Sequence, residues 1–297
     1  GLPEEGHTRP GEILIGTDSH TCTAGAFGEF ATGVGNTDAG FVAGTGKIWL
    51  KVPPTMRFVF EGTPPPYIMA KDMILHIIGD IGVDGATYRA MEFAGDGVRA
   101  LNMEERMTLC NMVIEGGGKN GVIEPDDVTV NYVKERTDKP FNVVLNDPDA
   151  QFHSERVYQT SSLEPTVAKP HSPGNRSTAR ELGGTKIDRA YIGSCTGGKI
   201  TDMRAAAQIL DGKETRVDTY VGTATGEVEK ALTTETSNGE TRKEICESAG
   251  ANIGPPSCAA CLGGPEDTFG RLNNAETCIS TTNRNFPGRM GYKKSEV

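Results

Sequence analysis

Residues 186–210, KIDRAYIGSCTGGKITDMRAAAQIL, decide the fold of this chain because an apolar strand, a glycine-rich loop and a helix follow one another there. We predict a strand at 186–192 and a helix at 202–210, with Cys195 in the loop between them. The pattern continues with a predicted strand at 215–221, a helix at 242–249 and a strand at 277–281. Strands that alternate with helices are typical of a parallel α/β sheet.

The first half of the chain also begins with a strand that ends in a polar turn. The strand Glu12-Ile-Leu-Ile-Gly16 runs into Thr17-Asp18-Ser19-His20-Thr21, and such turns at strand ends often carry functional side chains. Beyond it we predict a strand at 56–60, helices at 72–81 and 103–115, and a connection from 137 to about 173. Asn111 and Glu115 lie one helical turn apart in this reading and can point the same way.

Charge and composition exclude several classes of protein. The 297 residues include 40 acidic and 30 basic side chains, a net charge of -10 that disfavours nucleic acid or an anionic membrane as a partner. No apolar run approaches the ~18 residues that cross a bilayer, so we expect a soluble protein. The chain does not begin with Met, and we expect both of its ends to be cuts in a longer protein.

The cysteines indicate metal or redox chemistry in a reducing compartment. Seven cysteines, an odd number scattered through the chain, do not form a disulfide scaffold. Cys258 and Cys261 form a CxxC pair between prolines and glycines, so that two thiolates can reach one metal centre from a single turn. A zinc knuckle would need a second close pair, and a thioredoxin-type site would need the pair at the start of a helix. With Cys195 the pair gives three thiolates, which leave a metal position open for catalysis.

The loop Gly193-Ser-Cys-Thr-Gly-Gly-Lys199 allows a second interpretation. It nearly matches the phosphate-binding loop GxxxxGK[ST], but Ile200 stands where that motif needs a hydroxyl for Mg²⁺. A nucleotide-binding enzyme is therefore the rival hypothesis. Residues 281–289, TTNRNFPGR, carry Arg284 and Arg289 in a glycine-containing loop, and arginine forks bind carboxylates with two hydrogen bonds. This favours a substrate that carries carboxylates.

Six segments together resemble the aconitase family, over nearly the whole chain and in the family's order. They are TDSHT at 17–21, CNMVIEGG at 110–117, KPHSP at 169–173, YIGSCTGGK at 191–199, PSCAACLGGP at 256–265 and TTNRNFPGRMG at 281–291. The resemblance implies a three-domain α/β architecture with the cofactor in a central crevice. Residues 1–52 would be the end of an incomplete first domain. The second domain would span 53–160, and the third, 161–297, would carry the cluster cysteines.

The resemblance also implies roles for individual residues. The ligands of a [4Fe–4S] cluster fall on Cys195, Cys258 and Cys261, in agreement with the spacing argument. Among the catalytic residues, Asp18 would pair with a histidine that lies before Gly1, Ser19 would contact substrate, and His20 would pair with Glu115. Asn111 and Asn283 would lie against the cluster, and Arg284 and Arg289 would bind substrate carboxylates. The other cysteines, Cys22, Cys110, Cys246 and Cys278, match no ligand position, and we assign them to packing.

The implied activity is a hydro-lyase reaction on a small hydroxy acid, without net oxidation or reduction. The segments GTDSHTCTAGAFGEFATGVGNTDAG and STTNRNFPGRMGY are most similar to the isopropylmalate branch of the family, with homocitrate or citrate as alternative substrates. In that branch the catalytic base belongs to a swivelling domain on a separate small subunit, so we expect a heterodimer. The compartment would be the cytoplasm in a bacterium and the plastid stroma in a plant or alga. An RNA-binding relative is disfavoured by the net charge of -10.

Overall fold

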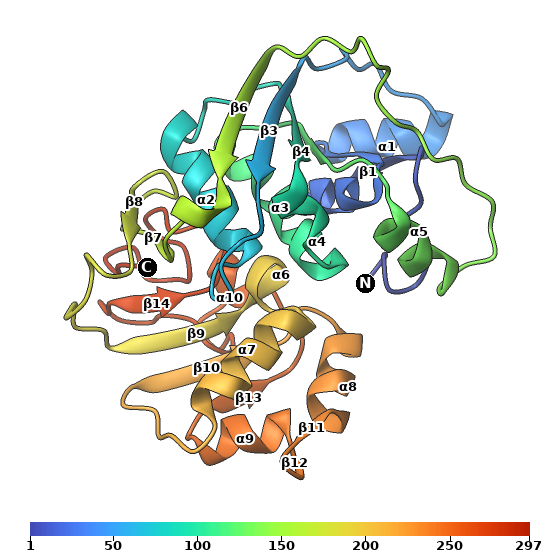
Figure 1. The fold of residues 1–297 in the computed structure, drawn as a ribbon. Helices are drawn as coiled ribbons and strands as arrows, with labels where there is room; N and C mark the ends of the chain where they lie inside the picture. The colour runs from blue at the N-terminus through green and yellow to red at the C-terminus, as the bar shows by residue number, and fades with distance from the viewer. The chain divides into compact units, whose positions relative to one another are not determined.

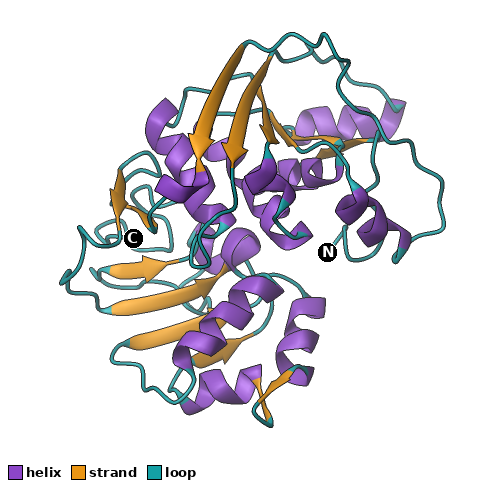
Figure 2. Cartoon of the chain, in the orientation of Figure 1, coloured by secondary structure: helices purple, strands orange, loops and turns teal.

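The computed structural model describes residues 1–297, which form two compact units (Figure 1). The N-terminal unit comprises Leu2–Thr166, and the C-terminal unit comprises Val167–Val297 together with Gly1. Both units contain a parallel sheet with helices beside it (Figure 2). No helix of the chain is both long and apolar enough to span a lipid bilayer.

The N-terminal unit is built on a four-stranded parallel sheet with the strand order β5-β4-β3-β6. Its strands are β3 (Thr55–Glu61), β4 (Ala90–Ala94), β5 (Asn120–Val122) and β6 (Ser154–Gln159). Along β3, Met56, Phe58 and Phe60 are buried and alternate with more exposed residues, as the period of two in a strand requires. Helix α2 (Ala70–Ile81) buries its apolar stripe and contacts α4 (Met103–Asn111).

A smaller layer of the same unit carries the TDSHT turn. Strands β1 (Ile13–Gly16) and β2 (Phe30–Gly33) pair in parallel, and the 3-10 helix η1 (Ser19–Phe27) connects them and packs on α4. The remaining helices of the unit are α1 (Asn36–Thr45), α3 (Asp96–Arg99), η2 (Met112–Gly116), α5 (Asp127–Lys134) and η3 (Thr160–Ser162). Glycine is required where η1 meets β5, because a Cβ on Gly25 would overlap the carbonyl oxygen of Gly121.

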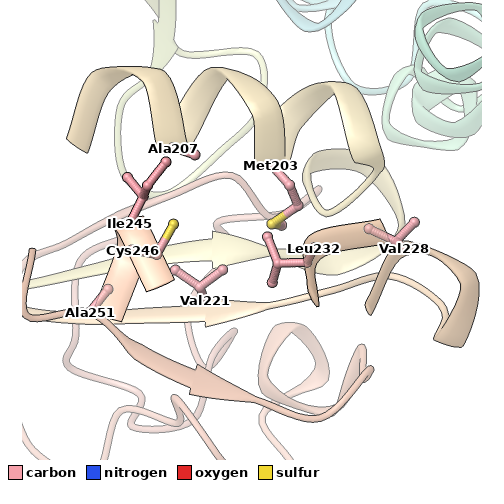
Figure 3. Close-up of a cluster of buried hydrophobic side chains, with 8 residues drawn as sticks. All are labelled: Met203, Ala207, Val221, Val228, Leu232, Ile245, Cys246 and Ala251. Atoms are coloured by element: carbon pink, nitrogen blue, oxygen red, sulfur yellow. The ribbon is translucent and has the colours of Figure 1, made fainter. Parts of the chain in front are cut away.

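The C-terminal unit has its own parallel sheet, with the order β13-β10-β9-β14. Its strands are β9 (Arg189–Gly193), β10 (Asp218–Gly222), β13 (Asn252–Gly254) and β14 (Cys278–Ser280). Helices α7 (Ile200–Leu210), α8 (Gly226–Thr234) and α9 (Arg242–Ser248) enclose one core with the sheet (Figure 3). That core contains Met203, Ala207, Val221, Val228, Leu232, Ile245, Cys246 and Ala251. Tyr191, which neighbours Ile192 in β9, belongs to a second core with Leu272 and Met290.

Short elements complete the C-terminal unit. Helices α6 (Ser194–Gly197) and α10 (Ala259–Leu262) follow β9 and β13. Two small sheets pair β7 (Thr166–Ala168) with β8 (Arg176–Thr178) and β11 (Thr236–Ser237) with β12 (Glu240–Thr241).

The structure confirms the predicted parallel α/β class and corrects two local expectations. The region 137–173 is more than a connection, because it contains β6, which pairs with β3, and the start of the β7–β8 pair. The predicted helix 103–115 ends as an α-helix at Asn111 and continues as the 3-10 helix η2. The expected boundary near 160 lies close to the division at Thr166, and the three-domain arrangement stays a prediction.

Candidate active site

The cysteines of the C-terminal unit lie at the carboxyl ends of its strands. Cys195 is in α6, directly after β9, and Cys258 and Cys261 lie on the turn of α10 that follows β13. In an open parallel sheet the loops at the carboxyl ends of the strands meet at one edge, where ligands bind. A hydrogen bond donated by the Cys258 thiol to Cys195, burial and the charge of Cys195 all raise the pKa of Cys258 above its usual range. Cys195 and Cys258 are therefore neighbours although their loops are far apart in the chain.

Asn283 contacts the cysteines of both loops. The thiols of Cys195 and Cys261 lie 3.7 and 3.8 Å from Asn283 Oδ1, and Asn283 Nδ2 lies 3.6 Å from Cys195 Sγ. This side chain is buried and follows β14, the strand beside β9. Three thiols and an amide from separate loops therefore share one location at the edge of the sheet.

The chemistry of this donor set fits a cluster of several metal ions. No group of three or more His, Cys, Asp or Glu side chains in the chain is arranged to hold a metal ion. An iron–sulfur cluster has a different requirement, because each thiolate binds a separate iron. Neighbouring thiols resist ionisation, as the raised pKa of Cys258 indicates, and a cationic cluster core supplies the charge that lets them ionise.

The backbone around Cys195 is held by Thr281. Its hydroxyl accepts a hydrogen bond from Gly193 N at 2.8 Å and lies 3.1 and 3.2 Å from the carbonyl oxygens of Gly193 and Gly197. A Cβ on Gly197 would overlap the Thr281 side chain, so the close approach requires glycine there. Ser194, at the turn from strand to helix, is buried with a φ of 79°, a left-handed conformation that is uncommon for serine. The backbone of residues 193–199, the thiol loop, is therefore tightly constrained.

The Lys199 side chain contacts the backbone of this loop. The residue is only 6% exposed. Its ammonium donates to the carbonyl oxygen of Thr196 and lies 3.4 Å from that of Cys195.

The two predicted carboxylate-binding arginines lie on the loop after β14. Arg284 and Arg289 are both partly buried, and Arg289 closes a turn in which its backbone N donates to Phe286 O. Asn285 anchors the loop, since its side-chain amide donates to the carbonyl oxygens of Ala168 and Lys169 at 3.2 and 2.8 Å. The arginines therefore have a fixed backbone.

In the N-terminal unit the expected contact between His20 and Glu115 is present. His20 Nε2 lies 3.1 Å from Glu115 Oε1, and His20 Nδ1 lies 3.2 Å from the Ser19 hydroxyl. The Glu115 side chain is fully buried, and that of His20 is 14% exposed. A neutral imidazole in this position can donate to the carboxylate and accept from the serine, so both ring nitrogens are oriented.

Asp18 begins the 3-10 helix that carries this pair. Its carboxylate accepts a hydrogen bond from His20 N at 2.6 Å and so caps η1, as an acid at a helix start commonly does. The Asp18 side chain itself is 78% exposed. The same carboxylate lies 3.6 Å from His20 Nδ1, so Asp18 contacts both the backbone and the ring of His20, and its expected pairing with a second histidine stays a prediction.

Sequence reasoning missed Thr23, which joins two of the predicted residues. Its hydroxyl accepts a hydrogen bond from Asn111 Nδ2 at 2.9 Å and donates to the carbonyl oxygen of His20 at 2.6 Å. Cys22, assigned to packing, is buried and its thiol also lies 3.4 Å from Asn111 O. A threonine one turn after a histidine on a 3-10 helix is the only sequence signal of this link.

The predicted site residues fall into two groups, one in each unit. Asp18, Ser19, His20, Asn111 and Glu115 come together around η1 and the end of α4. The thiols, Asn283 and the two arginines belong to the loops of the C-terminal sheet.

The chain belongs to the aconitase family. The family model for aconitase (aconitate hydratase) matches residues 2–183 and 175–297. Among similar proteins, the 3-isopropylmalate dehydratase large subunit, chloroplastic, of Arabidopsis thaliana is 59% identical over all of this chain and 59% of its own length. The 3-isopropylmalate dehydratase large subunit of Aquifex aeolicus is 47% identical over 99% of this chain and 68% of its own length. The 3-isopropylmalate dehydratase large subunit 1 of Pyrococcus abyssi is 49% identical over 100% of this chain and 69% of its own length.

This membership confirms the aconitase-like α/β fold class that the six motifs predicted. It also argues against the nucleotide-binding alternative, because the aconitase family model covers the loop 193–199. The chain spans 59% of the Arabidopsis relative, so these relatives are longer than the chain.

Proposed function

We propose that this chain is the cluster-binding part of a hydro-lyase that interconverts 2-isopropylmalate and 3-isopropylmalate in leucine biosynthesis. The observation that carries the proposal is the contact of Asn283 with the thiols of Cys195 and Cys261, beside Cys258. The names of the relatives, 3-isopropylmalate dehydratase large subunits at 46–59% identity, support the choice of substrate.

The cofactor in this proposal is a [4Fe–4S] cluster held by Cys195, Cys258 and Cys261. With three thiolates for four irons, one iron would have no protein ligand, and the cluster would supply a Lewis acid for the substrate hydroxyl. Asn283 contacts two of the thiols and so helps to orient the cysteine side chains. Asn111, whose side chain Thr23 orients, is the asparagine of the N-terminal unit that we assign, like Asn283, to a position against the cluster.

The polar residues bind the substrate and move protons. Arg284 and Arg289 bind its carboxylates, because a guanidinium matches a carboxylate with two parallel hydrogen bonds. Neutralising a carboxylate also makes the proton on the neighbouring carbon more acidic. His20 delivers a proton to the departing hydroxyl group, while Glu115 holds the imidazole and stabilises its charged form. Ser19 contacts substrate, and Asp18 pairs with a further histidine of the full-length protein.

The partner is a small subunit that carries the swivelling domain and the base that removes the carbon-bound proton. The designation "large subunit" of the relatives supports a two-subunit enzyme. We place the protein in the plastid stroma if its source is a plant or alga, following the chloroplastic relative, and in the cytoplasm if the source is a bacterium.

Substrate choice is tested with the full-length protein and its small subunit after anaerobic reconstitution with iron and sulfide. We expect turnover of isopropylmalate well above that of homocitrate or citrate. A preference for citrate would contradict the substrate assignment, and a preference for homocitrate would move the protein to the neighbouring branch.

The cluster is tested by replacing one ligand and one unrelated cysteine. Cys195→Ser should lose iron and visible absorption, because two thiolates do not hold the cluster. Cys246→Ala is the matched control, since Cys246 is buried in the core between α7, α8 and α9 and the cluster of this variant should stay intact. Full iron content in Cys195→Ser would disprove the assignment of this ligand.

A further inference from the structure

Lys199 is a buried cation beside the loop that carries Cys195. The residue is 6% exposed at the start of α7, and its ammonium contacts the carbonyl oxygens of Cys195 and Thr196. Lysine is rarely buried unless its charge is paired or solvated by hydrogen bonds. Here the loop itself supplies the acceptors, so the lysine side chain folds back onto the residues before it and closes the loop.

Asp202 provides the opposite charge for this lysine. Its Oδ2 atom accepts a hydrogen bond from Lys199 N at 2.9 Å, and the Lys199 ammonium lies 3.7 Å away from the same oxygen. The latter distance is longer than a hydrogen bond, so the ammonium is hydrogen-bonded to the thiol loop and only attracted by the acid. The Asp202 side chain is 16% exposed, which limits the screening of this attraction by water.

We propose that Lys199 is a positioning residue for the cluster ligand Cys195, and that its charge stabilises the anionic cluster. The inference rests on the proposed function, because it assumes a cluster on Cys195. The ammonium fixes the Cys195 carbonyl and thereby the direction of its thiol, and it is a fixed positive charge in a weakly screened environment. Net charge near an iron–sulfur cluster is one of the factors that set its reduction potential.

The charge of Lys199 predicts the direction in which the cluster's reduction potential changes, whereas a purely structural role predicts no direction. A nearby cation favours the more negative, reduced state of a cluster, so losing the cation lowers the reduction potential. Losing the acid beside that cation has the opposite effect, because the full positive charge then acts on the cluster. Lys199→Met and Asp202→Asn should therefore shift the potential in opposite directions. The side-chain amide in Asp202→Asn keeps an oxygen that can accept the bond from Lys199 N.

The experiment uses the full-length protein, reconstituted anaerobically with iron and sulfide, and measures the cluster's reduction potential by spectroscopically monitored titration. We expect a lower potential in Lys199→Met, a higher one in Asp202→Asn and a potential near wild type in Lys199→Arg, which keeps the charge. Loss of iron to a chelator should be about 10-fold faster in Lys199→Met, as for other residues that support a metal ligand. Lys199→Arg should restore most of this difference.

Two results would overturn the inference. The first is an unchanged potential in both charge variants, and the second is a shift of both in the same direction. If Lys199→Met does not fold, the sign of the shift in Asp202→Asn decides alone. Failure of the proposed function is recognised separately, because the wild-type protein would then take up no cluster at all.

Discussion

The ion pair between Arg106 and Asp126 allows a quantitative test of how the end of α4 is held. Arg106 lies on α4, is completely buried and forms two parallel hydrogen bonds of 2.7 Å each with the Asp126 carboxylate. Its guanidinium also donates to the carbonyl oxygens of Leu101 and Arg99. The same helix ends at Asn111, so this pair stabilises the scaffold of the polar group around η1 and the end of α4.

The cost of breaking the pair depends on which group remains. Removing one partner of a buried ion pair costs about 3–5 kcal/mol, since the remaining charge is left without compensation. Asp126→Asn leaves a fully buried guanidinium and should cost about 3–5 kcal/mol, whereas Arg106→Met leaves a carboxylate that is 33% exposed and should cost about 3 kcal/mol. The double variant should be far less destabilised than the sum, because neither charge then remains.

Urea unfolding followed by circular dichroism measures the free energy of unfolding of the wild type, the two single variants and the double variant. Separate transitions are fitted if the two units unfold independently. The pair also predicts a pH dependence. Burial acts to raise the pKa of Asp126, but the hydrogen bonds and charge of Arg106 outweigh it and hold the pKa below the usual value. A depressed pKa contributes stability above the unfolded value of about 4, and that contribution is lost as the pH falls. Additive costs, or an Asp126→Asn cost below about 1 kcal/mol, would refute the reasoning.

Three further predictions concern other parts of the fold. Burial raises the pKa of Glu29 to about 7, so the contribution of Glu29 to stability is present below about pH 4.5 and lost as the pH rises through 7. Glu29→Gln should flatten the dependence of the thermal unfolding temperature on pH between pH 5 and 8. Gly25→Ala should lower the yield of folded protein sharply, because its methyl group meets the Gly121 carbonyl, while Gly44→Ala in α1 meets nothing and should stabilise by about 0.5–1 kcal/mol. Leu232→Ala should cost about 2–5 kcal/mol in urea unfolding, and a cost near zero would contradict the burial of this side chain.

Sequence patterns predicted the elements whose burial is periodic. Strand β9 and helix α7 were found because their apolar residues repeat at the spacing of a strand and of a helix. Strand β6 was missed because SERVYQ is largely exposed, so its assignment depends on pairing with β3 rather than on its own composition. Helix α8 was missed for a similar reason, since it buries only Val228 and Leu232.

The candidate site was predictable where chemistry is carried by residue type. Cysteines at metal-ligand spacing and paired arginines are visible without coordinates. The contact between Asn283 and two thiols depends on the strand order and leaves no pattern in the sequence. The link of Thr23 to Asn111 leaves only the spacing of three residues between His20 and Thr23. Lys199 lies in the loop that resembles a phosphate-binding motif, and the contact of its ammonium with the loop's own carbonyl groups was not predicted from the sequence.

The position of β14 has a consequence for how the protein is made. This strand is the last in the chain, yet it pairs with β9 and leads to Asn283, which contacts the thiols of Cys195 and Cys261. During synthesis the ribosome therefore releases all three cysteines before the segment that arranges them. A nascent chain that ends before Cys278 has its thiols but lacks the strand and the amide beside them. If the proposed cluster is bound, iron delivered during translation would meet cysteines that Asn283 does not yet contact, so we expect its assembly to follow folding of the C-terminal unit.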